Sequence, residues 1–314
     1  MAFSHSMHLL RESDLDSFDE ERGPLVEKIR RPDTPKPVKK HPVNRPDPTK
    51  EGIVRELGPG RCHVWAEGRP WICLLPGRFM TTQKESLAVG DRIRFRPLGG
   101  GEGCLTEVVP RKTTLDRPDP GNRHRRNIIA ANLDAAVVVG TVSDPPFKPG
   151  LIDRFLVRLQ MADIQPILCL NKMDLSEQAP DLPQIEEELG HYQDNGVLIV
   201  RVSAKTGAGL EALQAALAGK IAAFVGHSGV GKTSLMNRLA PEEHRETHSV
   251  RDFDGKGRHT TSGSLLLEIA PGSFLIDTPG IRSLGLGALT VNEILGAFPE
   301  FRAVGLPCRF SDCR

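Results

Sequence analysis

The chain lacks the features that would mark a membrane-bound or secreted protein. No apolar run approaches the length of about 20 residues that a membrane-spanning helix needs, and the N-terminus lacks the apolar core of a signal peptide. The 6 cysteines follow no regular framework, which argues against disulfides and for a reducing compartment. These absences predict a cytoplasmic protein without a membrane partner.

The chain also lacks an excess of positive or negative charge, but its acidic and basic residues are separated along the sequence. The formal net charge is +1 over 314 residues, a length that exceeds what one core usually serves. An acidic stretch at residues 12–21 precedes a basic, proline-rich stretch at residues 28–50. Such a segment buries too little apolar surface to offset its ordering entropy, so we expect a disordered acidic-then-basic tail over residues 1–48. It is either a solvated tail or an arm that orders on RNA phosphates.

Residues 49–112 are predicted to form a β-barrel of the OB type. Short strand-like runs separated by turns are typical of such barrels, which commonly bind nucleic acid. Three aromatic residues are candidates for stacking on bases, with core packing as the alternative: Trp65, Trp71 and Phe79. Three arginines alternate along one strand and predict a basic stripe, which is the more convincing contact surface: Arg92, Arg94 and Arg96.

Residues 113–126 have the composition of a basic linker between this barrel and the following domain. The segment is either a solubilising hinge or a hinge that contacts phosphates. We favour contact with phosphates, since the segment lies beside both domains. The cations that would make it are Arg123, Arg125 and Arg126.

The most specific single motif is a glycine-rich run at residues 226–233. It lies between a strand-like apolar run and a helical pattern, as a phosphate-binding loop requires. Its glycines let backbone N–H groups surround phosphates, whereas the alternative is a glycine-rich turn that binds nothing. Lys232 is expected to reach the β- and γ-phosphates and Thr233 to ligate Mg²⁺. The predicted nucleotide contacts here are Gly226, His227, Ser228, Gly229, Val230, Gly231, Lys232, Thr233 and Ser234.

An Asn-Lys-x-Asp run at residues 171–174 predicts that the nucleotide carries guanine. The run follows a buried-strand pattern, which puts it at the carboxyl end of a strand, where open α/β sheets bind ligands. Its aspartate can accept two hydrogen bonds from the N1–H and N2–H₂ edge of guanine, and adenine offers no such pair of donors. The asparagine is expected to tie the loop to neighbouring backbone and the lysine stem to cover the base. The predicted base contacts are Asn171, Lys172, Asp174, Ser203, Ala204 and Lys205.

Two elements after the phosphate loop complete a site for Mg²⁺ and the γ-phosphate. Asp277 ends a strand-like run and is suited to hold Mg²⁺ through water, while the Gly280 N–H is placed to contact the γ-phosphate. One of two adjacent threonines supplies a further Mg²⁺ ligand, and the sequence does not decide between them. The predicted Mg²⁺ ligands are Thr233, Thr260, Thr261 and Asp277.

A residue that orients the attacking water must also be found. Many GTPases use a glutamine directly after the glycine of the last motif, and this chain has Ile281 there. His259 precedes the two threonines, and a neutral imidazole can orient water or accept its proton. The alternative is a solvent-facing histidine. We take His259 and Lys232 as the candidate catalytic residues.

The order of these motifs is rotated. Both base-reading runs precede the phosphate loop, whereas an ordinary GTPase begins with that loop. We therefore predict a circularly permuted GTPase domain over residues 127–285. Permutation is tolerated when the old termini lie close together and the new cut falls in an exposed connection.

The chain resembles the bacterial ribosome small-subunit-dependent GTPase A family. The resemblance rests on the permuted order and on residues 127–134, 150–156, 257–261 and 308–313, and it extends from about residue 50 onward. It implies an OB-fold, a permuted GTPase domain, a small zinc-bearing helical domain and action in late maturation of the small ribosomal subunit. It also implies that the switch histidine, here His259, serves hydrolysis.

Residues 286–314 match the zinc segment of that family in part. Cys308 and Cys313 correspond to its first two zinc ligands, and the sequence stops at Arg314, before the family's histidine and third cysteine. Since structural zinc normally takes four ligands, we expect an incomplete site. An apolar side at helical spacing predicts a helix over residues 290–301.

The predicted fold class is therefore α/β: a circularly permuted P-loop GTPase domain with a mixed, mostly parallel sheet, an N-terminal OB-fold β-barrel and a truncated C-terminal helical zinc segment. We expect a monomer that binds GTP or GDP with Mg²⁺, attaches to the small ribosomal subunit and its rRNA, and is released on hydrolysis. The alternatives are a non-catalytic RNA-binding module and a nucleotide-dependent phosphotransferase.

Overall fold

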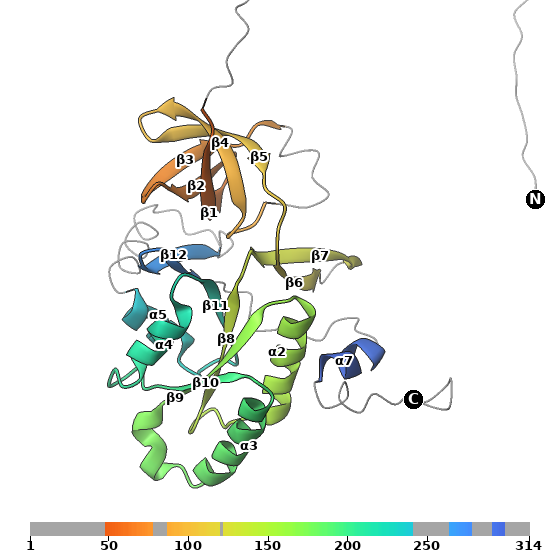
Figure 1. The fold of residues 1–314 in the computed structure, drawn as a ribbon, viewed down its shortest axis with the longest axis vertical. Helices are drawn as coiled ribbons and strands as arrows, with labels where there is room; N and C mark the ends of the chain where they lie inside the picture. Colours follow the sequence, from red (N-terminus) through yellow and green to blue (C-terminus); the bar gives the residue numbers. More distant parts are fainter. Residues whose placement is uncertain (1–47, 78–86, 120–121, 241–263, 278–290, 299–314) are drawn as a thin grey trace, which may run out of the picture. The chain divides into compact units, whose positions relative to one another are not determined.

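The computed structural model describes residues 48–77, 87–119, 122–240, 264–277 and 291–298. Residues 46–314 belong to one compact unit, and its described part consists of a β-barrel, a β-ribbon and a six-stranded sheet with helices (Figure 1). Except for Pro48, the predicted tail lies outside the described residues. So do several residues of the predicted sites, namely Phe79, His259, Thr260, Thr261, Gly280, Cys308 and Cys313.

The barrel is closed by five strands in the order β1-β2-β3-β5-β4. Its interior is filled from alternate strand positions, and Val54, Val64, Phe95 and Leu105 are at most 1% exposed. This confirms the predicted OB-type barrel. The strands are β1 (Lys50–Gly58), β2 (Arg61–Ala66), β3 (Arg69–Leu74), β4 (Arg92–Gly99) and β5 (Glu102–Val108).

The two tryptophans of the barrel are packing residues. Trp71 is 3% exposed, its indole N–H donates to Ala66 O over 3.2 Å, and its ring centroid lies 5.3 Å from that of Phe95. Trp65 is half-buried and packs against the core of the sheet domain. For Trp71 the structure therefore bears out core packing, the alternative to stacking on a base, because the ring is buried.

The three arginines of the predicted stripe alternate along β4 as expected, separated by buried residues. Their charges are nevertheless partly compensated. The Arg94 guanidinium donates to Glu51 and Glu107, each over 2.9 Å, and these carboxylates raise the pKa of Arg94. The outer face of β4 is therefore less basic than the sequence alone indicates.

The segment expected to be a linker is a two-stranded antiparallel ribbon. It is formed by β6 (Thr114–Asp119) and β7 (Asn122–Ala131), with Arg117 paired to Asn127 and Pro118 to Arg126. Composition did not predict this ribbon, because composition reports only the local chain, whereas a ribbon pairs residues that are apart in the sequence. The basic run thus lies on a paired strand.

The six-stranded sheet has the order β10-β9-β8-β11-β13-β12. All neighbours are parallel except β12 and β13, so the prediction of a mixed, mostly parallel sheet is confirmed. Every residue of β8 and β11 is buried, as expected of central strands covered on both faces. The strands are β8 (Ala135–Thr141), β9 (Gln165–Asn171), β10 (Leu198–Arg201), β11 (Ile221–Val225), β12 (Leu265–Ala270) and β13 (Ser273–Asp277).

Helices pack on both faces of this sheet. In α2 (Pro149–Met161), Pro149 suits the first turn, and Ile152, Phe155 and Leu159 form one apolar side. This side and α3 (Leu182–Asp194) join one core cluster, whereas α4 (Leu210–Leu217) and α5 (Lys232–Leu239) join the other. Two short elements are η1 (Met173–Gln178) and α7 (Val291–Ala297), which contacts α2 and lies within the predicted helix over 290–301. None of the described helices has the length and apolarity needed to cross a membrane.

A joint of specific hydrogen bonds connects the barrel to the sheet domain. Asn132, in a left-handed conformation, donates to Gly90 O over 3.0 Å and accepts from Lys112 N over 2.9 Å. Gly90 has a φ of +90°, and a Cβ there would lie 2.1 Å from Ala131 O, so the close approach requires glycine. Nearby, Arg111 donates to the buried carboxylate of Asp91 over 2.6 and 2.8 Å.

Candidate nucleotide-binding site

The predicted nucleotide motifs meet at one edge of the sheet. Since β9, β10, β11 and β13 run in the same direction, the segments after them all emerge at their carboxyl ends. Asn171 ends β9, Ser203 follows β10, Gly226 follows β11 and Asp277 ends β13. Residues far apart in the sequence are thereby neighbours.

The glycine-rich loop passes too close to its surroundings for side chains. Gly226 has a φ of +141°, and a Cβ there would lie 2.6 Å from Val139 O in β8. Gly231 has a φ of +96°, and a Cβ there would lie 2.3 Å from the side-chain nitrogen of Asn171. Both positions therefore need glycine to keep the loop against the central strands.

Polar groups of this loop and of the first turn of α5 are accessible. The Lys232 ammonium donates to Gly226 O over 2.8 Å and to His227 O over 2.6 Å, so it is held over the loop. Thr233 and Ser234 are exposed. Val230 is 3% exposed and belongs to the core, so any nucleotide contact it makes is through its backbone.

The side chain of Asn171 connects three of the predicted motifs. It is 1% exposed, donates to Val230 O over 2.9 Å and accepts from Ala204 N over 3.0 Å. The Asn-Lys-x-Asp run, the phosphate loop and the Ser-Ala-Lys run thus share one buried amide. The expectation that Asn171 ties its loop to neighbouring backbone is confirmed.

Asp174 is oriented by the second base-reading run. Ser203 donates its hydroxyl to one carboxylate oxygen over 2.6 Å and accepts from Thr206 N over 3.1 Å. The Lys205 ammonium lies 3.9 Å from the other carboxylate oxygen, with 80% of the lysine side chain exposed but only 13% of that of Asp174. Ser203 therefore orients the carboxylate that is predicted to bind the base.

Lys172 has a left-handed backbone conformation, with φ 63° and ψ 32°, and its ammonium donates to Asp144 O. The segment that follows β8 therefore belongs to the site. The Cβ of an alanine at Gly229 would also meet Pro145 of this segment at 3.4 Å. Sequence analysis did not predict this neighbour, since its contribution is a backbone carbonyl that any residue carries.

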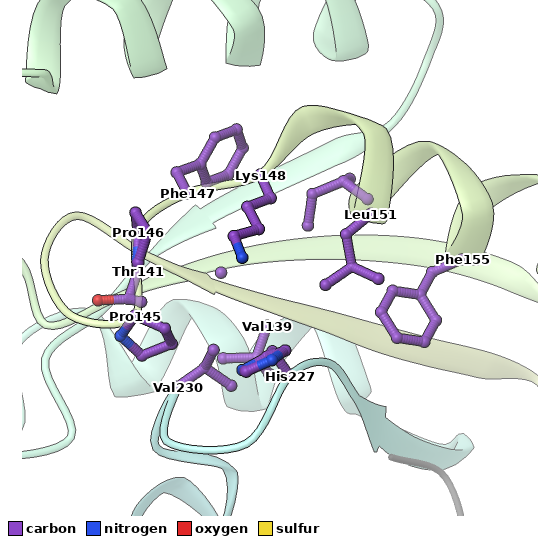
Figure 2. Close-up of a pocket in the computed structure, with 12 residues that line it drawn as sticks. Val139, Thr141, Pro145, Pro146, Phe147, Lys148, Leu151, Phe155, His227 and Val230 are labelled. Carbon is purple, nitrogen blue, oxygen red and sulfur yellow. The ribbon is translucent and has the colours of Figure 1, made fainter. Parts of the chain in front are cut away.

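A small pocket borders the phosphate loop (Figure 2). Most of its walls are apolar, and Lys148 and His227 are the ionisable side chains that line it. Of the predicted nucleotide contacts, only His227 and Val230 belong to the lining, and none of the base-reading residues does. The pocket is therefore adjacent to the predicted nucleotide site and distinct from the base site.

Arg238 of α5 is a second polar contact that sequence analysis missed. Its Nε donates to Ala204 O over 2.9 Å, and a terminal nitrogen donates to Lys205 O over 2.6 Å. No local motif marks this arginine, because the contact joins a helix to a loop over 30 positions away in the chain.

Two residues of the predicted Mg²⁺ set are described, Thr233 and Asp277. Thr233 is exposed, and Asp277 is half-buried at the end of the strand next to β11. Hydroxyl and carboxylate oxygens are the hard donors that Mg²⁺ prefers, so the residues present fit this ion.

The chain is similar to known GTPases. Residues 108–287 match the family model of the RsgA GTPase. The chain is 36% identical over 262 residues to the small ribosomal subunit biogenesis GTPase RsgA of Moorella thermoacetica, covering 83% of this chain and 84% of that protein. The corresponding protein of Pseudomonas fluorescens is 39% identical over 236 residues, with 75% and 68% covered.

Solved structures lead to the same family. The structure of YjeQ from Thermotoga maritima is similar with a TM-score of 0.68 and 32% identity, covering 84% of this chain and 86% of that one. The structure of YloQ, described as a circularly permuted GTPase, is similar with a TM-score of 0.65 and 29% identity, with 84% and 83% covered. These likenesses confirm the predicted permuted fold and the family resemblance. The chain belongs to the RsgA GTPase family.

Proposed function

We propose that this chain hydrolyses GTP to GDP and phosphate in late maturation of the small ribosomal subunit. The observation that carries the proposal is the buried amide of Asn171, which holds both base-reading runs and the phosphate loop together. A loop arrangement that only turned the chain would not need this bridge. The names of the relatives support the biological setting.

Guanine recognition falls to Asp174. Its carboxylate accepts from Ser203 on one oxygen, which leaves lone pairs on both oxygens for the N1–H and N2–H₂ of guanine. Adenine would leave this oriented, largely buried carboxylate without donors, a loss of about 1–3 kcal/mol. Asn171 keeps the base loop in place, and the stem of Lys172 lies beside the base.

Phosphate binding falls to the glycine-rich loop and its lysine. The Lys232 ammonium is already turned towards the loop by Gly226 O and His227 O, and from there it reaches the β- and γ-phosphates. Mg²⁺, when bound, neutralises charge on the phosphates. Thr233, Asp277 and one of the pair Thr260 and Thr261 would hold this ion, and the Gly280 N–H would contact the γ-phosphate.

We assign the orientation of the attacking water to His259. Ile281 follows Gly280 and has no polar group for this task, while His259 stands next to the Mg²⁺-binding threonines in the sequence. His259→Ala should abolish subunit-stimulated hydrolysis while leaving the affinity for GTP unchanged. Stimulated hydrolysis at the wild-type rate would remove His259 from the mechanism.

The partner is the small ribosomal subunit with its rRNA, bound by a monomer in the cytoplasm. GTP favours attachment and hydrolysis favours release, which requires that the subunit discriminate between the two nucleotide states. Basic residues of β7 contact rRNA phosphates. Replacing Arg123, Arg125 and Arg126 together should therefore flatten the dependence of subunit binding on salt.

The decisive experiment measures GTP hydrolysis with and without purified small subunits, using ATP as the control nucleotide. Stimulation that is specific for GTP is the expected result. Equal turnover of ATP and GTP would contradict the guanine site. Basal GTP turnover that subunits do not change would retain the GTPase and reject the partner.

A further inference from the structure

We infer that Arg238 is a positioning residue for guanine recognition. It lies in the last turn of α5, the helix that begins at the phosphate-loop lysine, Lys232. From there it holds the carbonyl groups of the Ser-Ala-Lys run. The inference rests on the guanine site proposed above and adds a residue outside its motifs.

The geometry of the contact suits a rigid support. Nε of Arg238 donates to Ala204 O over 2.9 Å, and the terminal nitrogen donates to Lys205 O over 2.6 Å. A guanidinium presents its donors in one fixed plane, so holding two successive carbonyls fixes the direction of the backbone between them. Charged donors also form stronger hydrogen bonds than neutral ones.

Fixing Ala204 O has a direct consequence for the adjacent N–H group. Ala204 O and the Lys205 N–H belong to the same planar trans peptide and point in opposite directions. Because the carbonyl faces Arg238 on α5, the N–H is turned away from that helix. Among the residues that the structure describes, the Lys205 N–H has no acceptor, whereas the Ala204 N–H donates to Asn171.

An available N–H at this position distinguishes guanine from adenine. Guanine carries a carbonyl oxygen, O6, where adenine carries an amino group, which is itself a donor. An N–H held towards O6 is satisfied by guanine and meets a second donor with adenine. Together with Asp174 on the opposite side of the base edge, the loop would read O6, N1–H and N2–H₂.

Other groups hold the rest of the loop, including Ser203 O, which accepts from the Gly207 N–H, but they do not hold the carbonyls of Ala204 and Lys205. Ser203 is bound through its hydroxyl to Asp174 and Thr206, and the Ala204 N–H is bound to Asn171. The Lys205 side chain is 80% exposed, so packing does little to hold this residue. Without Arg238 the peptide between Ala204 and Lys205 loses the contacts that hold its carbonyl side, and the base contact weakens.

The test compares Arg238→Ala with Arg238→Lys and with Asn237→Ala, an exposed neighbour on the same helix. We would measure the affinities of each protein for GDP and ADP by titration. Arg238→Ala should weaken GDP binding about tenfold without changing ADP binding, so the ratio of the two falls. Arg238→Lys should restore part of the ratio, and Asn237→Ala should leave it at the wild-type value.

Hydrolysis gives a second measurement. Arg238→Ala should raise KM for GTP while kcat at saturating GTP stays unchanged, since Arg238 does not touch the phosphates. An unchanged GDP-to-ADP ratio, with or without a lower melting temperature, would reduce Arg238 to a structural residue and overturn the inference. If the wild-type protein itself bound GDP no more tightly than ADP, that result would contradict the guanine site proposed above, independently of Arg238. If the alanine variant did not fold, Arg238→Gln would be measured in the same way.

Discussion

The barrel and the six-stranded sheet carry similar polar residues but arrange them differently. On the barrel, Arg94 faces outward and is neutralised by Glu51 and Glu107 on the neighbouring strands. At the sheet edge, parallel strands bring together residues 59 positions apart, such as Asn171 and Val230. A closed barrel has no such edge, because its strands satisfy one another all round. The sheet therefore brings its polar groups together in one site, whereas the barrel distributes its polar groups over its surface.

The polar contacts at the sheet edge also contribute more to stability than those on the barrel surface. The ion pairs of Arg94 are exposed, with 44% of the arginine side chain accessible, and exposed pairs contribute little to stability because water screens the two charges. The amide of Asn171 is 1% exposed, and leaving its partners unsatisfied costs about 1–3 kcal/mol for each group. Substitutions at the sheet edge should therefore have larger effects than substitutions on the barrel surface.

The largest effect is expected from Lys232→Ala. Removing the ammonium that Gly226 O and His227 O hold in place deletes a positive charge from the phosphate site. Hydrolysis of GTP should fall by a factor of about 100–1,000, measured as phosphate release. The barrel should remain folded by circular dichroism. Turnover within a factor of about two of wild type would show that the nucleotide site does not lie at the carboxyl ends of the sheet strands, and the contrast with the barrel would no longer hold.

Asp174→Asn should change the base that is recognised. An amide offers one acceptor and one donor, so it cannot accept from both N1–H and N2–H₂ of guanine, but its donor matches the C2 carbonyl of xanthine. GDP affinity should fall about 100-fold and xanthosine diphosphate affinity should rise, as measured by titration. Asp181→Asn is the matched control, since Asp181 precedes α3 and its side chain forms no capping hydrogen bond. An equal fall in the affinity for GDP in both variants would show that Asp174 does not recognise the base.

Gly90→Ala tests the joint between the two regions. The new Cβ would lie 2.1 Å from Ala131 O at a φ of +90°, so the joint must open or shift. The expected loss of stability is about 2–3 kcal/mol, measured by denaturant unfolding. Gly60→Ala is the control, since Gly60 also has a positive φ, +70°, but nothing lies within 4 Å of the added Cβ. Equal losses would mean that backbone strain, and not contact at the joint, decides the outcome.

The smallest expected effect is a difference in the rate of thiol labelling between the barrel and the sheet. Burial raises the pKa of Cys62, Cys73 and Cys169 to about 12, so the thiols stay protonated at neutral pH and react only when the surrounding structure opens. The barrel cysteines, Cys62 and Cys73, should label faster than Cys169, because the hydrophobic core of the barrel is smaller than the core cluster of the sheet to which Cys169 belongs. Labelling should accelerate as pH rises from 7 to 9 because the opened thiols ionise. Peptide mapping measures each site, and faster labelling of Cys169 would reverse the expected order of regional stability.

The site residues that could be predicted from the sequence are those that belong to local motifs. The Asn-Lys-x-Asp run and the glycine-rich loop each combine a strand-like run with residues of defined chemistry, and the structure brings them to one edge. The pairing of residues 114–131 as a ribbon was not predicted, and for Trp71 the sequence left base stacking and core packing both open. A ribbon depends on pairing across a turn, and the burial of a tryptophan depends on which strands close around it.

The sequence by itself determined the fold class, the rotated order of the motifs and the family, because these follow from residue types and short spacings that need no partner. Only the tertiary structure decided which groups support them: Ser203 orienting Asp174, the Asp144 carbonyl binding Lys172, and Arg238 holding the loop carbonyls. The physical reason is that a hydrogen bond depends on distance and direction in space. Backbone carbonyls and helix-borne arginines carry no local signature of the partner that they will meet.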